Sequence, residues 1–185
     1  SINDLIPKRR RKRQDWTTNP CGEIILRPRG FCNLSEVIIR EEDTLPELME
    51  KVRVATIIGT IQSTLTNFSL LDELHDDWKK NAEEERLLGV SLTGQMDNPD
   101  ILTPENLQAL RDFSVGVNVE YAERLKINRS VAITTTKPSG TASILVNSSS
   151  GFHPRFAPYY IRRVRISATD PLYSMMKDQG VNFIP

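Results

Sequence analysis

The stretch Asn19-Pro20-Cys21-Gly22-Glu23, followed by Phe31-Cys32-Asn33-Leu34-Ser35-Glu36, is the most informative part of this chain. It places an amide, a thiol and a carboxylate at alternate positions, so Asn19, Cys21 and Glu23 would project to one side of an extended segment. A thiol can act as a nucleophile, a metal ligand or, after one-electron oxidation, a radical. A nearby carboxylate can accept a proton, and an amide can orient a hydroxyl. The stretch therefore predicts a compact reactive set.

Plainer interpretations of the same residues stay open at this point. An Asn-Pro-x-Gly string is typical of a turn, because proline fixes one backbone angle and glycine frees another. An isolated cysteine is often only a small buried hydrophobic residue. The chain holds two cysteines, so a Cys21–Cys32 structural disulfide is a further alternative, although thiols stay reduced in the cytosol.

Three later segments are considered together with this stretch. They are Leu88-Gly89-Val90-Ser91-Leu92-Thr93-Gly94, then Thr134-Thr135-Thr136-Lys137-Pro138-Ser139-Gly140-Thr141, and then Gly151-Phe152-His153-Pro154 leading to Tyr160-Ile161-Arg162-Arg163-Val164-Arg165. Together with residues 18–37 they resemble, in order, the catalytic subunits of ribonucleotide reductases, and most of all the adenosylcobalamin-dependent ribonucleoside-triphosphate reductases. The resemblance covers residues from about 15 to 170. It implies an α/β fold, part of the ten-stranded barrel of these enzymes with its finger loop.

The resemblance also implies a role for four residues near the finger loop. Cys21 would be the thiyl radical that takes the 3' hydrogen from the ribose, and Glu23 would be the base for the 3' hydroxyl. Asn19 would hold the substrate hydroxyls. Cys32 would be one of two cysteines that supply electrons as the 2' hydroxyl leaves as water; its partner is not in this chain.

The implied activity is the reduction of ribonucleoside triphosphates to 2'-deoxyribonucleotides with adenosylcobalamin as cofactor. The implied partners are an external dithiol reductant such as thioredoxin and the remainder of the same polypeptide. A diiron-subunit or glycyl-radical source would use the same thiyl chemistry and stays open. Because the resembled enzymes are several times longer, we expect an internal segment that is not active alone.

The residues around 130–142 predict a second site. Ser130 to Thr136 is β-branched and extended, and a glycine-containing turn then leads into a short helix. Backbone N–H groups at such a turn favour an anion. By resemblance, the substrate phosphates would sit on Pro138, Ser139, Gly140, Thr141 and Ala142. An ordinary turn with a helix cap is the alternative, and the ending of a Walker loop is absent.

Helical and extended patterns alternate along the rest of the chain, which predicts a largely parallel sheet or barrel. A capping box at Thr44-Leu45-Pro46-Glu47 starts a helix to about Asn67, with Leu48, Val52, Ala55, Ile58 and Ile61 inward. Further predictions are helices over 72–85, from Thr103-Pro104 to about Lys126, and from Asp170-Pro171 to Gly180, with strands over 87–92 and 160–167.

Charge and composition bound the remaining possibilities. Lysine plus arginine equals aspartate plus glutamate at 24 each, but six basic residues run together at 8–13. We expect residues 1–14 to be a basic, flexible lead-in and residues 15–185 a partial catalytic barrel; a nucleic-acid patch is the alternative, without a recognisable binding module. No apolar run reaches the roughly 20 residues of a membrane span, so we expect a cytoplasmic protein without a membrane partner.

The two histidines and the arginines near the C-terminal end add no predicted site. His75 and His153 are not spaced with the cysteines as metal ligands would be, so no metal is expected. Arg162, Arg163 and Arg165 suit either phosphate recognition or a charged sheet edge. The competing function is a non-catalytic nucleotide-phosphate or nucleic-acid binding segment in which Cys21 is inert.

Overall fold

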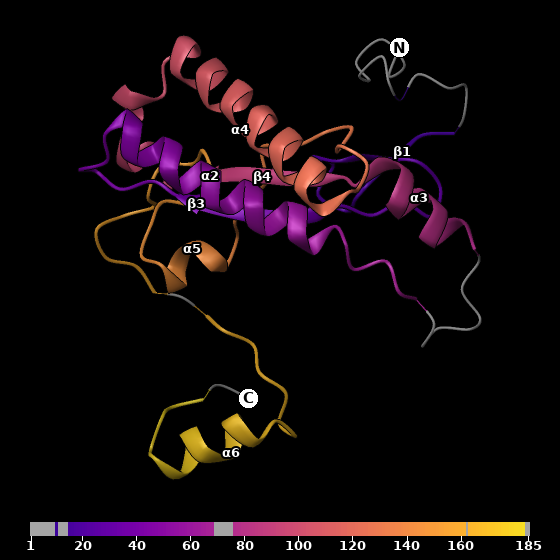
Figure 1. Ribbon diagram of the computed structural model, residues 1–185. Coiled ribbons are helices and arrows are strands. Elements are labelled where there is room, and N and C mark those ends of the chain that lie inside the picture. Colours follow the sequence, from indigo (N-terminus) through magenta and orange to yellow (C-terminus); the bar gives the residue numbers. More distant parts are fainter. Residues whose placement is uncertain (1–9, 11–14, 69–75, 162, 184–185) are drawn as a thin grey trace. The chain divides into compact units, whose positions relative to one another are not determined.

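A computed structural model describes residues 10, 15–68, 76–161 and 163–183 (Figure 1). The chain divides into two units, Ser1–Arg155 and Phe156–Pro185. The first unit contains β1 (Thr17–Thr18), β2 (Ile25–Leu26), β3 (Asn33–Ile38), α2 (Leu45–Gln62), α3 (Asp77–Glu85), β4 (Leu88–Thr93), the short 3-10 helices Gln95–Asp97 and Pro99–Ile101, α4 (Pro104–Leu125) and α5 (Ala142–Leu145). The second unit contains α6 (Pro171–Asp178).

The centre of the first unit is a parallel pair of strands covered by helices. β3 and β4 pair from Asn33↔Leu88 to Ile38↔Thr93, and α2 and α4 pack beside them (Figure 1). The core cluster comprises Val37, Ile39, Leu48, Val52, Ala55, Leu88, Val90, Leu110 and Ile133. The predicted α/β class and parallel pairing are confirmed. Within the described residues the sheets are small, and they do not form a ten-stranded barrel.

The segment predicted to be extended after α4 adds a partial third strand. A single parallel bridge joins Val90 to Thr134. The Val90 amide donates to Ile133 O at 2.8 Å, and the Thr135 amide donates to Val90 O at 3.0 Å. The segment therefore lies along β4 without forming a regular strand, and it ends next to Lys137.

Helix α2 begins as predicted and buries Leu48, Val52 and Ala55 as predicted, but not the two isoleucines. The Thr44 amide and hydroxyl both donate to Glu47 Oε2, at 2.9 and 2.7 Å, which satisfies the first turn. The helix ends at Gln62 and not near Asn67. The inward placement of Ile58 and Ile61 was wrong, since they are 55% and 50% exposed.

The inner face of α2 continues through small and hydroxyl-bearing residues. Thr56 and Thr60 are fully buried, and the Thr56 and Ser114 hydroxyls lie 2.8 Å apart across the α2–α4 interface. Asn118 of α4 donates to the hydroxyls of Thr60 and Ser130, at 3.0 Å each, and its Oδ1 accepts from the Ser130 amide. Close helix packing therefore depends on paired polar groups, and the isoleucines take the outer face.

Most of the other predicted elements are present. α4 starts after Thr103, whose side chain caps Asn106 N, and it ends before Lys126. α3 covers the described part of the helix predicted over 72–85, of which residues 72–75 lie outside the described residues. α6 follows the Asp170 cap as predicted and ends at Asp178.

The strand predicted over 160–167 was wrong for its described residues, which contain no strand and are nearly all exposed. An alternating pattern becomes a strand only where a neighbour accepts its ladder hydrogen bonds, and none is present in the described residues.

Only Arg10 represents the basic run at 8–13, because the other five residues lie outside the described residues. Arg10 is 5% exposed and forms a two-pronged ion pair with Glu85, with Nε–Oε1 2.8 Å and Nη2–Oε2 3.1 Å. Its Nη1 donates to Ile25 O at 2.9 Å. This arginine therefore fixes the end of α3 to β2. None of the described helices is long and apolar enough to cross a membrane.

We predict that Asn118→Leu lowers the free energy of unfolding by about 2–3 kcal/mol, because it leaves buried hydroxyl and amide groups without partners. Gln108→Leu, an exposed amide on the same helix, is the matched control and should change it by less than about 0.5 kcal/mol. Urea unfolding of the full-length protein followed by circular dichroism measures both. Equal effects of the two substitutions would contradict the structural role of the Asn118 network.

Candidate active site

The Asn19–Glu23 stretch forms a tight turn between β1 and β2. Asn19 builds this turn: its amide donates to Ile24 O at 3.2 Å, its carbonyl accepts from Gly22 N at 2.9 Å, and its Oδ1 accepts from Ile24 N at 2.9 Å. Gly22 has φ of +82°, which favours glycine. The expectation of an extended segment with Asn19, Cys21 and Glu23 on one side was therefore wrong, and the turn interpretation holds.

The two cysteines have different surroundings. Cys21 is exposed at the tip of the turn, whereas Cys32, just before β3, is partly buried. Both are free thiols, so the Cys21–Cys32 disulfide alternative is not what the structure shows. Burial raises the pKa of the Cys32 thiol to about 12; Arg10 and Lys137 oppose this rise, and Glu23 adds to it.

Glu23 turns its carboxylate inward, although it is two residues from the exposed cysteine. Its side chain is 6% exposed, and neither carboxylate oxygen has a hydrogen-bond partner among the described residues. Lys137 Nζ lies 3.8 Å from Glu23 Oε1. The Thr135 hydroxyl donates to Glu23 O at 3.0 Å, which fixes the end of the turn to the segment beside β4. The structure thus brings Glu23, Cys32 and Lys137 together.

Gly89 of β4 makes room for this group. A Cβ at position 89 would lie 2.4 Å from Leu34 Cδ2, 3.2 Å from Thr135 Cγ2 and 3.3 Å from Cys32 Sγ. A side chain at this position would therefore have to displace Leu34 and press on Thr135 and Cys32. The strand glycine therefore allows the Cys32 sulfur and Thr135 to approach the sheet closely.

The predicted phosphate-binding residues form a turn that leads into α5. Gly140 has φ of +56°, and α5 has only four residues. Ser139 is buried, and its hydroxyl donates to Glu36 Oε2 at 2.9 Å; Pro138, Gly140, Thr141 and Ala142 are exposed. The loop is thus anchored to β3 through Glu36, and it follows directly after Lys137.

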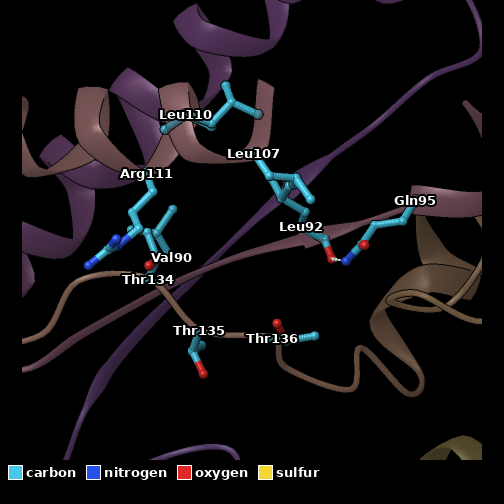
Figure 2. Close-up of a pocket in the computed structure, with 10 residues that line it drawn as sticks. Val90, Leu92, Gln95, Leu107, Leu110, Arg111, Thr134, Thr135 and Thr136 are labelled. Atoms are coloured by element: carbon cyan, nitrogen blue, oxygen red, sulfur yellow. Dashed lines mark hydrogen bonds between the residues drawn. The ribbon is translucent and has the colours of Figure 1, made fainter. Parts of the chain in front are cut away.

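A cavity of about 330 Å³ lies between α4 and the segment after it (Figure 2). It is lined by Val52, Val90, Leu92, Gln95, Leu107, Leu110, Arg111, Thr134, Thr135 and Thr136. Figure 2 shows the leucines and Arg111 on one side and the threonines on the other, with Gln95 Nε2 donating to Leu92 O at 3.0 Å. The lining contains none of the four predicted catalytic residues, but it shares Thr135 with the candidate site.

The described residues contain no group of three or more histidine, cysteine, aspartate or glutamate side chains that could hold a metal ion. His75 lies outside the described residues, and His153 stands in a turn, where its amide donates to Ser150 O at 2.9 Å. The candidate site is therefore built from thiols, carboxylates and one ammonium group.

Reasoning from the sequence assigned no role to three residues of this site, Lys137, Glu36 and Gly89, although all three lie in the quoted segments. Two signals were available. Thr135 and Lys137 are two positions apart in an extended segment, which places them on one face. A glycine within a buried strand indicates the close approach of another group.

No protein-family model matches the chain, but several curated proteins that share one name are similar to it. An adenosylcobalamin-dependent ribonucleoside-triphosphate reductase of Lactobacillus acidophilus is 30% identical over 91% of this chain. Proteins of the same name from Lactobacillus helveticus and Lactobacillus leichmannii are 28% and 29% identical over 91% and 88% of it. The chain spans about a quarter of the length of these relatives, 26%, 26% and 25% respectively.

A solved structure shares the fold. The crystal structure of a B12-dependent, class II ribonucleotide reductase superposes with a TM-score of 0.61 at 24% identity, covering 87% of this chain and 26% of that one. At this identity the match shows the fold, which is that of one segment of the larger reductase chain.

We predict that iodoacetamide at pH 8 alkylates Cys21 at least about tenfold faster than Cys32, because alkylation needs an accessible thiolate. Cys21 is exposed, whereas the raised pKa of Cys32 leaves almost no thiolate at that pH. Mass spectrometry of the two peptides measures the rates, and complete denaturation is the control that should equalise them. Equal rates in the folded protein would contradict the burial of Cys32.

Proposed function

Because this chain is homologous over 91% of its length to adenosylcobalamin-dependent ribonucleoside-triphosphate reductases, we propose that it is the catalytic-centre segment of such an enzyme. The proposed reaction converts a ribonucleoside triphosphate and a dithiol into a 2'-deoxyribonucleoside triphosphate, a disulfide and water. The observation that supports it best is an exposed thiol, Cys21, on the same turn as Glu23, whose inward carboxylate interacts with the second thiol, Cys32.

Each of these side chains has a step that suits its surroundings. Cys21, as a thiyl radical, would take the hydrogen atom from C3' of the ribose, and its exposure at the turn tip leaves it accessible. Glu23 would accept the proton of the 3' hydroxyl, because its oxygens are not occupied by protein donors among the described residues. Asn19 would position the substrate hydroxyls from the base of the same turn.

Cys32 suits the reducing step. Its high pKa keeps the sulfur protonated near neutral pH, so it can deliver a proton to the departing 2' hydroxyl. The electrons come from the two reducing thiols, which become a disulfide. At the end of the cycle the Cys21 thiol would return its hydrogen atom to C3' of the product, which regenerates the thiyl radical. Cys21 and Cys32 are the two cysteines of this sequence. Because Cys21 carries the radical, we place the disulfide partner of Cys32 in the remainder of the polypeptide.

Adenosylcobalamin, when bound, would supply the one-electron oxidation that converts the Cys21 thiol into the radical. The exposed position of that thiol fits an oxidant that approaches from outside this segment.

The finer features of the proposal follow from the same relationship. The parallel pairing of β3 with β4, and of β4 with Thr134, is consistent with residues 15–185 forming part of a ten-stranded barrel. Residues 138–142 would contact the substrate phosphates through the backbone, since the Ser139 hydroxyl is engaged by Glu36. We further propose residues 1–14 as a lead-in, an external dithiol such as thioredoxin as reductant, and a cytoplasmic location.

Replacement of the two reacting groups tests the proposal. We predict that Cys21→Ser and Glu23→Gln in the full-length protein each lower deoxynucleotide formation by at least about a hundredfold, with triphosphate binding changed less than about threefold. Glu120→Gln, an exposed carboxylate on α4, is the control and should keep full activity. Chromatographic product analysis and equilibrium binding measure the two quantities. Unchanged activity of Cys21→Ser would favour the phosphate-binding alternative with an inert cysteine.

The radical source has its own test. We predict that adenosylcobalamin restores activity to the cofactor-free full-length protein without oxygen and without a second protein subunit. Anaerobic assays with and without the cofactor measure this. A requirement for a diiron or glycyl-radical protein would contradict the assignment while leaving the thiyl chemistry in place.

A further inference from the structure

The ammonium group of Lys137 faces the carboxylate of Glu23, which accepts no hydrogen bond from the described residues. Lys137 Nζ lies 3.8 Å from Glu23 Oε1, and both Glu23 oxygens are buried without a hydrogen bond from the described residues. A buried carboxylate is costly unless a positive charge or donors compensate it. At 3.8 Å the contact is electrostatic and does not require a direct hydrogen bond.

The backbone of Lys137 is held where its side chain meets the turn. A Cβ at Gly151 would lie 3.2 Å from Lys137 O, so the chain around position 151 packs closely on Lys137. On one side of it, Thr135 donates to Glu23 O, and on the other, Ser139 donates to Glu36. Both neighbours are therefore anchored, which limits how far the ammonium group can move from Glu23.

The other charged and titratable groups near this contact are Cys32 and Arg10. The Cys32 thiol interacts with Glu23, with Lys137 and with Arg10. Arg10 is already engaged by Glu85 and by Ile25 O. Lys137, at 30% side-chain exposure, is thus the cation in contact with Glu23.

We propose that Lys137 is a positioning residue for the reaction: its ammonium group places a positive charge beside the buried Glu23 carboxylate and holds it in place, and it links the loop at 138–142 to the turn that carries Cys21. This inference rests on the proposed role of Glu23 as the base. It assigns Lys137 to the carboxylate, not to the substrate phosphates, although Lys137 immediately precedes the phosphate loop.

Steady-state kinetics of the full-length holoenzyme with a ribonucleoside triphosphate distinguish these assignments. Lys137→Met should lower kcat by about tenfold or more and change KM by less than about threefold, because the buried Glu23 carboxylate loses the positive charge that compensates and positions it. Lys137→Arg keeps the charge and should retain more than about a third of kcat. Lys80→Met, an exposed lysine on α3, is the matched control and should behave as wild type.

Three results would overturn the inference. A raised KM with kcat retained in Lys137→Met would make the lysine a phosphate ligand. Equal loss of kcat in Lys137→Met and Lys137→Arg would show that side-chain shape matters and charge does not. Wild-type kcat in Lys137→Met, in an enzyme that Glu23→Gln inactivates, would remove this inference alone, whereas full kcat in Glu23→Gln would remove the proposed function itself.

The alkylation rate of Cys32 tests the position of the Lys137 ammonium group without an activity assay. Lys137 lowers the pKa of the Cys32 thiol, so Lys137→Met should slow iodoacetamide alkylation of Cys32 by about two- to threefold at pH 9, in a Cys21→Ser background. Lys80→Met should leave the rate unchanged. A faster or unchanged rate in Lys137→Met would place the ammonium group away from the site and contradict the proposal.

Discussion

The register between β3 and β4 is the constraint on which the rest of the first unit depends. Side chains alternate across a strand, so Ser35 and Val37 face α2, where the Ser35 hydroxyl donates to Ala55 O at 3.1 Å. Leu34 and Glu36 consequently take the opposite face, next to Gly89 and Ser139. A slip of one residue would exchange the two faces. The same pairing that buries the core therefore also orients the candidate site.

Local signals in the sequence were sufficient for helices and their ends. The cap at Thr103 and the capping box at Thr44 act within one turn of chain, and both helices start where these signals place them. The exposure of Ile58 depends on a distant partner: α4 approaches α2 through Ser114 and Asn118, so small and polar residues occupy the interface. Hydrophobicity alone could not show which face of α2 meets that helix.

The sequence indicated some residues of the candidate site but not its geometry. The resemblance named Cys21, Glu23 and Cys32, but the turn around Gly22 replaces the extended arrangement that their spacing suggested. The contact between Glu23 and Lys137 joins positions more than a hundred residues apart, and only the path of the chain beside β4 brings them together. Composition and spacing carry no information on such a contact.

The protonated state of Cys32 has a consequence for oxidative damage. Peroxide attacks thiolates, and sulfenic acid formation follows thiolate character and access. A buried sulfur with a pKa of about 12 is thus shielded from adventitious oxidants, while the exposed Cys21 is open to them. In the proposed reaction, this shielding would keep Cys32 reduced for the ribose, and oxidative inactivation should begin at Cys21.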